Sequence, residues 1–211
     1  MREALAIIEE AGVEALSLRD VARRLNVSHQ APYKHFPSRD HLLAEIVGRA
    51  FTAFARHLDA RPRGDSPRED LAAMGQAYLG YATEHPLQYR LMFGTPLPDP
   101  DRHPEMMRSA QHAFLLLRDG LARIATEQGP PEGPEGAAEL DALFVWATMH
   151  GLASILHSHA LDTLGLSASV LAAAIPHALR RVGAALPSTA AGLGAGNATQ
   201  LRPPRFEEDE P

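Results

Sequence analysis

The chain has 211 residues, 45% of them hydrophobic and 6% aromatic, and a formal net charge of −6 at pH 7. That length and apolar content can bury a substantial core, which excludes disorder throughout the chain, and the frequent Ala and Leu residues favour an all-α fold. The absence of cysteine excludes disulfides, thiolate-bound zinc and a cysteine nucleophile. Without a long apolar run or a signal peptide, the sequence predicts a cytoplasmic protein with no membrane partner.

Four helices are predicted in the first sixty residues. The apolar spacing gives the ranges 2–11, 18–25, 28–36 and 39–60. Gly12 ends the first helix, while Ser17, Ser28 and Ser38 precede the next three as N-cap residues. Pro32 stands near the start of the third helix, where the loss of one backbone donor should be tolerated.

Five more helices follow, separated by loops rich in Pro and Gly. Their predicted ranges are 67–85, 87–93, 105–128, 137–163 and 168–186, which gives about nine helices in all. Residues 187–211 are predicted to be disordered because they contain almost no large apolar side chains. The chain is therefore divided into a small helical domain at 1–48, a larger helical bundle at 49–186 and a tail.

The charge of the chain is unevenly distributed. Residues 17–39 contain five basic residues and one acidic residue, whereas residues 61–211 contain twelve basic and eighteen acidic residues. A small basic region on an acidic body is expected when one short element meets phosphate groups. The short helices at 18–25 and 28–36 also have the layout of a DNA-reading helix-turn-helix, although similar pairs occur in helical proteins that do not bind DNA.

The segment from Gly12 to Leu43, GVEALSLRDVARRLNVSHQAPYKHFPSRDHLL, resembles the DNA-binding domain of the TetR family of bacterial transcription regulators. Its most specific part is Tyr33-x-His35-Phe36 followed by Ser38-Arg39-x-x-Leu42. The resemblance implies an N-terminal helix-turn-helix domain that binds double-stranded DNA. It also implies contacts with backbone phosphates, which position a protein without reading sequence, from Ser17, Tyr33, His35 and Arg39.

Base reading requires other side chains. The start of the second predicted helix and the first turns of the third carry donors and acceptors that suit base edges in the major groove. The candidates are Arg19, His29, Gln30 and Lys34. For each of them the alternative is an ordinary solvated surface residue.

The larger bundle resembles the TetR subgroup whose ligand domain carries a tryptophan-histidine-glycine signature. The resemblance rests on His85-Pro86-Leu87-Gln88-Tyr89-Arg90-Leu91-Met92-Phe93 and on Trp146-x-x-x-His150-Gly151-Leu152-Ala153. It implies a homodimer in which the last two long helices pair with their copies, and a two-fold dimer predicts a palindromic operator with half-sites about 34–36 Å apart. The candidate interface residues are Leu140, Phe144, Ala147, Gly151, Ile155 and Leu171.

A ligand pocket is expected inside the bundle, lined by apolar and amphipathic side chains. The candidates are Met74, Tyr78, Tyr81, Met92, Phe93, Phe114, Leu117, Trp146 and His150. For any one of them the alternative is ordinary core packing, because Met and aromatic residues at helical spacing usually belong to a core. The predicted function is repression that a small apolar or amphipathic ligand releases, with activation by the ligand left open.

An enzyme is the main alternative from another class, since eleven histidines suggest a metal site. The sequence lacks an HExxH pair, a GxSxG elbow and phosphate-binding glycine motifs, and His157 and His159 would diverge on a helix. We therefore predict no catalytic residue, no cofactor and no metal. A second alternative is an adaptor that keeps the fold without binding DNA, because the first helix starts later than is usual in the family.

Overall fold

The computed structural model of the protein describes residues 1–94, 96–127, 136–158 and 160–186. These residues form helices and loops, with no strand among them, which confirms the predicted all-α class. The tail predicted at 187–211 lies outside the described residues. The helices are α1 (Arg2–Ala11), α2 (Leu18–Arg24), α3 (Arg39–Asp59), α4 (Pro67–Glu84), α5 (Pro86–Phe93), α6 (Pro104–Glu127), α7 (Ala137–Leu156), α8 (Ala160–Thr163) and α9 (Ala168–Ala185), with the 3-10 helices η1 (Val13–Ala15) and η2 (Pro32–Lys34).

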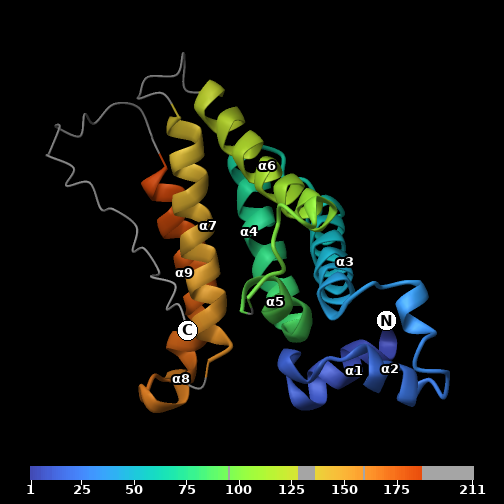
Figure 1. Ribbon diagram of the computed structural model, residues 1–211. Coiled ribbons are helices and arrows are strands. Elements are labelled where there is room, and N and C mark those ends of the chain that lie inside the picture. Colours follow the sequence, from blue (N-terminus) through green and yellow to red (C-terminus); the bar gives the residue numbers. More distant parts are fainter. Residues whose placement is uncertain (95, 128–135, 159, 187–211) are drawn as a thin grey trace, which may run out of the picture.

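A small N-terminal unit consists of α1, α2 and the beginning of α3 (Figure 1, blue). α2 and α3 start at the predicted caps. Ser17 Oγ accepts a hydrogen bond from the backbone N–H of Asp20 at 3.0 Å, and Ser38 Oγ accepts one from the backbone N–H of His41 at 3.3 Å. Each cap satisfies an N–H group that has no partner inside its helix. The unit has a compact apolar core, in which Leu42 is almost fully buried.

The chain leaves α2 through a tight turn that needs a left-handed residue. Asn26 has a φ of 53°, and the N–H groups of Asn26 and Val27 return to the carbonyls of Arg23 and Ala22, both at 3.1 Å. Asparagine adopts the left-handed conformation more readily than most residues, so it can end this helix where glycine is absent. The tight turn therefore falls where the sequence predicts one, although the next element, η2, begins only at Pro32.

The third predicted helix, at 28–36, does not form as an α-helix, and this prediction is wrong. Residues 29–31 form a turn, and only the short η2 follows it. Pro32 is the physical reason, because it has no N–H to donate to the carbonyl of Ser28. That carbonyl instead accepts from the N–H of Ala31 at 2.9 Å, which closes a tighter turn.

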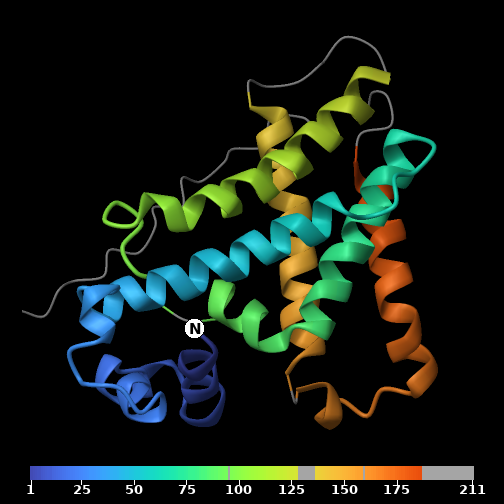
Figure 2. The ribbon, with the colours of Figure 1, turned by 90° about the vertical axis from the view of Figure 1, so that its right-hand side faces the viewer.

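α3 joins the N-terminal unit to the larger bundle without a break (Figure 2). It passes through the predicted domain boundary at residue 48 as continuous helix, and it packs along α6 and against α4 and α5. Its later turns bury Phe51 and Phe54 in the bundle. A rigid helix that belongs to both parts carries a displacement of one part to the other.

The helix predicted at 137–163 is interrupted, so that prediction is wrong in its second half. α7 ends at Leu156, and α8 is a separate short helix. Two side chains bond to carbonyls of the last turn of α7: His157 Nδ1 to Ala153 at 2.6 Å, and Ser158 Oγ to Ile155 at 2.8 Å. Such side-chain bonds compete with the backbone ladder and favour the end of a helix.

A buried ion pair fastens the loop between α3 and α4 to α6. The Arg61 side chain, 2% exposed, donates to the carboxylate of Asp70 at 3.0 Å, and Arg123 of α6 reaches the same oxygen. Burial raises the pKa of Asp70, but the bond from Arg123 and the nearby arginine charges outweigh burial and hold it below its usual range. Asp70 therefore stays ionised and holds three segments of the chain together.

Candidate functional site

The segment predicted to meet DNA is open to solvent. Six of the eight predicted DNA contacts are exposed: Arg19, His29, Gln30, Tyr33, Lys34 and His35. All but one lie on the turn at 29–31 or at η2, which packs against α2, and Arg19 lies in the first turn of α2. Tyr33 is 49% exposed although it is a large aromatic residue. The exposed aromatic and basic side chains thus gather on two neighbouring elements.

The other two predicted DNA contacts, Ser17 and Arg39, are engaged within the N-terminal unit. The Ser17 hydroxyl donates to the Asp20 carboxylate at 2.6 Å. Arg39 donates from Nη2 to the carbonyl of Val13 at 2.8 Å and from Nε to the carbonyl of Leu16 at 3.0 Å. These bonds tie the start of α3 to the segment ahead of α2, so both side chains have a structural role here.

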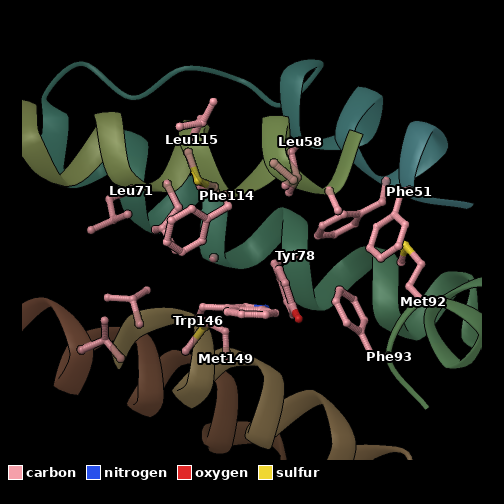
Figure 3. A pocket seen from close by; sticks show the side chains of 18 of the residues that line it. Phe51, Leu58, Leu71, Tyr78, Met92, Phe93, Phe114, Leu115, Trp146 and Met149 are labelled. Atoms are coloured by element: carbon pink, nitrogen blue, oxygen red, sulfur yellow. The ribbon is translucent and has the colours of Figure 1, made fainter. Parts of the chain in front are cut away.

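A cavity of about 580 Å³ lies in the larger bundle, where α3, α4, α5, α6, α7 and α9 meet (Figure 3). Its wall consists mostly of aliphatic, aromatic and Met side chains. Arg68 is the one charged side chain among the described residues that line it. A cavity of this size and character suits a small organic molecule, because most of the surface that such a molecule buries is apolar.

Most of the predicted pocket residues line this cavity. They are Met74, Tyr78, Met92, Phe93, Phe114, Leu117 and Trp146. Tyr81 and His150 are not among the lining residues. Tyr81 is buried elsewhere on α4, with its ring centroid 5.2 Å from that of Phe54 and 5.3 Å from that of His57, and burial raises its pKa to about 12. Its position is therefore that of a core residue.

His150 lies beside the cavity in a cluster with two tyrosines. The Tyr89 hydroxyl is 2.7 Å from His150 Nδ1 and 3.1 Å from the Tyr78 hydroxyl. Burial lowers the pKa of His150 and raises the pKa values of Tyr78 and Tyr89, which leaves all three groups uncharged at neutral pH. Because Tyr78 also lines the cavity, the cluster presents a polar group to a mostly apolar space.

The sequence analysis missed much of the cavity wall. Helical periodicity could have found part of it, because Leu71 and Gly75 on α4 and Ala110 on α6 stand about one turn from predicted residues. The wall residues from α3 and α9, such as Phe51 and Leu179, carried no comparable signal. Their position depends on how helices distant in sequence pack together.

Two features connect the cavity wall with the N-terminal unit. The first is α3 itself, which lines the cavity with Phe51, Phe54 and Leu58. The second is His103, just ahead of α6, whose Nε2 lies 2.7 Å from the carboxylate of Asp40 in the first turn of α3. The hydrogen bond to His103 lowers the pKa of Asp40. A movement of α3 or α6 therefore acts on the start of α3.

One face of α7 is apolar and exposed. The predicted dimer residues on α7 are Leu140, Phe144, Ala147, Gly151 and Ile155, at spacings of three or four residues that put them on one side of the helix. Leu140 is 59%, Phe144 47% and Ile155 50% exposed, whereas Leu171 on α9 is half-buried. A continuous exposed apolar face of this kind is typical of a surface that binds another protein.

The described residues hold no group of three or more side chains arranged to bind a metal ion. His41 and His103 stand edge to face, with ring centroids 4.9 Å apart, but they bond to Ser38 and Asp40 respectively. None of the described helices is long and apolar enough to cross a membrane.

Two protein families match the chain. Residues 71–182 match the family described as tetracyclin repressor-like, C-terminal domain, and residues 1–46 match bacterial regulatory proteins, tetR family. The HTH-type transcriptional regulator Rv1816 of Mycobacterium tuberculosis is 35% identical over 120 residues, which cover 53% of this chain and 51% of that protein. The HTH-type transcriptional repressor KstR of Mycolicibacterium smegmatis is 38% identical over 71 residues, or 33% of this chain and 35% of that protein. The chain thus spans about half the length, or less, of these curated relatives.

A solved structure extends the similarity over both helical units. The crystal structure of the regulatory protein SCO4313 matches with a TM-score of 0.68 at 25% sequence identity, and the match covers 86% of this chain and 91% of that chain. One family covers the N-terminal unit, and the other covers more than half of the whole chain. The chain therefore belongs to the TetR family of bacterial regulatory proteins.

Proposed function

We propose that this protein is a transcription repressor that binds operator DNA as a homodimer and releases it when a small apolar or amphipathic molecule enters the cavity. The observation that carries the proposal is that one helix, α3, both begins in the N-terminal unit and walls an apolar cavity of about 580 Å³. A molecule that fits one position of α3 better than another shifts the balance between the two positions. Its binding then changes how the N-terminal units face DNA.

The N-terminal unit binds DNA through the turn at 29–31, η2 and the start of α2. Phosphate contacts come from Ser17, Tyr33, His35 and Arg39, and base contacts from Arg19, His29, Gln30 and Lys34. The support is that six of these eight side chains are exposed on adjacent elements, within a segment that is basic although the chain as a whole is acidic. Phenol, imidazole and guanidinium groups can all donate to phosphate, while amide and guanidinium groups match base edges.

The exposed face of α7 pairs with its own copy across a two-fold axis. Small residues at Ala147 and Gly151 allow two helices to approach closely, and Leu140, Phe144 and Ile155 supply apolar area around them. Such an interface is isologous, so it holds the two N-terminal units in symmetric positions. The operator is then an inverted repeat whose half-sites lie about one turn of DNA apart.

The ligand domain belongs to the tryptophan-histidine-glycine subgroup, and the positions of the signature residues support a role in sensing. Trp146 lines the cavity, and His150, one turn later on α7, bonds to the tyrosine cluster beside it. The same helix carries the proposed dimer face. Ligand binding at Trp146 therefore also acts on the helix that sets the distance between the two copies.

The test is to incubate the purified chain with random duplex DNA at fixed salt and to sequence the bound fraction. We expect an enriched motif with two-fold symmetry. Gln30→Ala should change the motif, because a base contact is lost, whereas Tyr33→Phe should keep the motif and weaken binding to every sequence. Lys34→Ala removes a positive charge from the same segment, so its effect is compared with those of Gln30→Ala and Tyr33→Phe, which leave the charge unchanged.

A folded dimer that enriches no sequence would contradict the proposal and would favour an adaptor that does not bind DNA. Equal loss on all sequences for Gln30→Ala and Tyr33→Phe would contradict the division into reading and positioning residues. Stronger DNA binding with an occupied cavity would show an activator or a co-repressor mechanism in place of release.

A further inference from the structure

Two polar groups of the cavity wall lie at separate places along α4, and the exposed Gln111 of α6 is a third. Arg68 lies in the first turn, is exposed, and donates from Nη1 to the carbonyl of Gly183 on α9 at 3.0 Å. Tyr78 lies ten residues further along the same helix, which is about 15 Å at the rise of an α-helix. Along α4, the head group of a bound molecule can therefore meet a cation at the first position or a phenol at the second.

The polar group at the Tyr78 end is held in place by neighbouring hydrogen bonds and is uncharged. Figure 3 shows the Tyr78 hydroxyl at the edge of the Trp146 indole, with Phe93 beside it. The hydroxyl lies 3.1 Å from the hydroxyl of Tyr89 and 3.5 Å from His150 Nδ1. Burial raises the pKa of Tyr78, and its proximity to Tyr89 raises it further. The tyrosine thus keeps its proton at neutral pH, and no charged group faces it among the described lining residues.

We propose that the cavity takes a neutral, mainly apolar molecule whose hydroxyl or carbonyl group hydrogen-bonds to Tyr78 next to Trp146. This inference rests on the proposed function, since it names the chemistry of the ligand for the same cavity. It also gives the signature residues a role: Trp146 contacts the ligand beside its polar group, and His150, through Tyr89, positions the Tyr78 hydroxyl.

The donors and acceptors at the Tyr78 end favour a neutral head group. A tyrosine hydroxyl can both donate and accept, so Tyr78 offers a ligand hydroxyl or carbonyl whichever role its bond with Tyr89 leaves open. A carboxylate buried at this end would need a cation or several donors, and the described lining residues offer no cation there. A carboxylate would instead be held at Arg68, with its chain pointing into the cavity.

The experiment compares 1-decanol with decanoate at pH 8, which differ in the charge of the head group. Trp146 is the single tryptophan of the sequence and lines the cavity, so intrinsic fluorescence reports binding directly, and thermal shift gives a second readout. Titrations use the full wild-type chain, Tyr78→Phe and Arg68→Gln. Tyr81→Phe is the matched control, because it removes a buried hydroxyl from the same helix outside the cavity wall.

We expect 1-decanol to bind at least about tenfold more tightly than decanoate to the wild-type chain. Tyr78→Phe should lower the affinity for 1-decanol by about three- to tenfold, the factor that one neutral hydrogen bond contributes. Tyr81→Phe should change that affinity by less than about twofold. The comparison of the two probes on the wild-type chain decides the question even if Tyr78→Phe fails to fold.

Tighter binding of decanoate, weakened by Arg68→Gln, would overturn the inference and leave the proposed function intact. Equal effects of Tyr78→Phe and Tyr81→Phe on 1-decanol would also overturn it. If neither probe binds, the inference fails, while enrichment of a DNA motif still decides separately whether the protein is a regulator.

Discussion

Replacing Arg39 by alanine should destabilise the N-terminal unit as well as weaken DNA binding. The guanidinium donates to the carbonyls of Val13 at 2.8 Å and Leu16 at 3.0 Å, and the side chain is 40% exposed. A hydrogen bond to a charged group contributes about 1.5–3 kcal/mol, and water competes for a group this exposed. Two such bonds would total about 3–6 kcal/mol, so with competition from water we expect about half of that, about 1.5–3 kcal/mol, which lowers the melting temperature by about 3–12 °C.

The assay combines unfolding with DNA binding. Denaturant and thermal unfolding of the full chain measure the stability loss, and Arg19→Ala, an exposed arginine of the same unit, should change stability by no more than about 0.5 kcal/mol. Arg39→Lys keeps the charge but lacks the planar guanidinium whose Nε and Nη2 reach the two carbonyls. It should lose stability like the alanine variant, while the salt dependence of DNA binding stays close to that of the wild type.

A melting temperature of Arg39→Ala within about 1 °C of the wild type would refute this reasoning. In that case the two carbonyl contacts do not stabilise the unit, and Arg39 acts only on phosphate. In that outcome the alanine variant is as stable as the wild type, and its plot of log binding constant against log salt concentration is shallower by about 0.9.

Three further predictions follow from the packing and the charges. Asp70→Asn should cost about 3–5 kcal/mol in denaturant unfolding, because it leaves a buried arginine unpaired, whereas the exposed Asp119→Asn should be nearly neutral; equal losses would contradict the structural role. Phe144→Lys should convert the dimer to a monomer at micromolar concentration in analytical ultracentrifugation, and an unchanged mass would place the dimer face elsewhere. The lowered pKa of Asp40 means that its contribution to stability is present above the ordinary value of 3.8 and is lost as the pH falls through the lowered one. His103→Gln should therefore flatten acid unfolding in that range, and an unchanged profile would show that the pair contributes nothing.

Local signals in the sequence predicted the helix starts well. Ser17 and Ser38 each accept a hydrogen bond from the N–H three residues on, which is the cap that their position ahead of an apolar run predicts, whereas no α-helix follows the third predicted cap, Ser28. Capping involves neighbours in the chain, so a single sequence contains all the information needed. The same holds for Asn26, whose turn is closed by nearby carbonyls.

Predictions that depended on competition between local and longer interactions failed in part. Pro32 was expected to remove one hydrogen bond, yet the tighter turn that it favours replaced the whole helix at 28–36. Likewise, side-chain bonds from His157 and Ser158 ended α7 where the apolar pattern predicted continuation. In both places the apolar pattern predicted a continuous helix, and local side chains changed the backbone bonding.

The cavity was predictable only where its wall repeats along one helix. Met74 and Tyr78 follow the spacing of α4, and a sequence pattern can suggest that they share a face. The bond of Tyr89 to His150 joins residues 61 positions apart, and the roles of Phe51 and Leu179 depend on the packing of α3 and α9. Such contacts require the fold, which a single sequence does not specify at that level of detail.

The central claim is that two copies of the exposed segment at 29–35, held together through α7, bind one DNA duplex. The most direct measurement is the affinity for the enriched duplex and for the same duplex with five base pairs inserted between the half-sites. Half a turn of DNA places the second half-site on the opposite face, so we predict that affinity falls about 10³-fold or more, toward non-specific binding. Unchanged affinity would show that the half-sites are bound independently and would contradict a two-fold dimer.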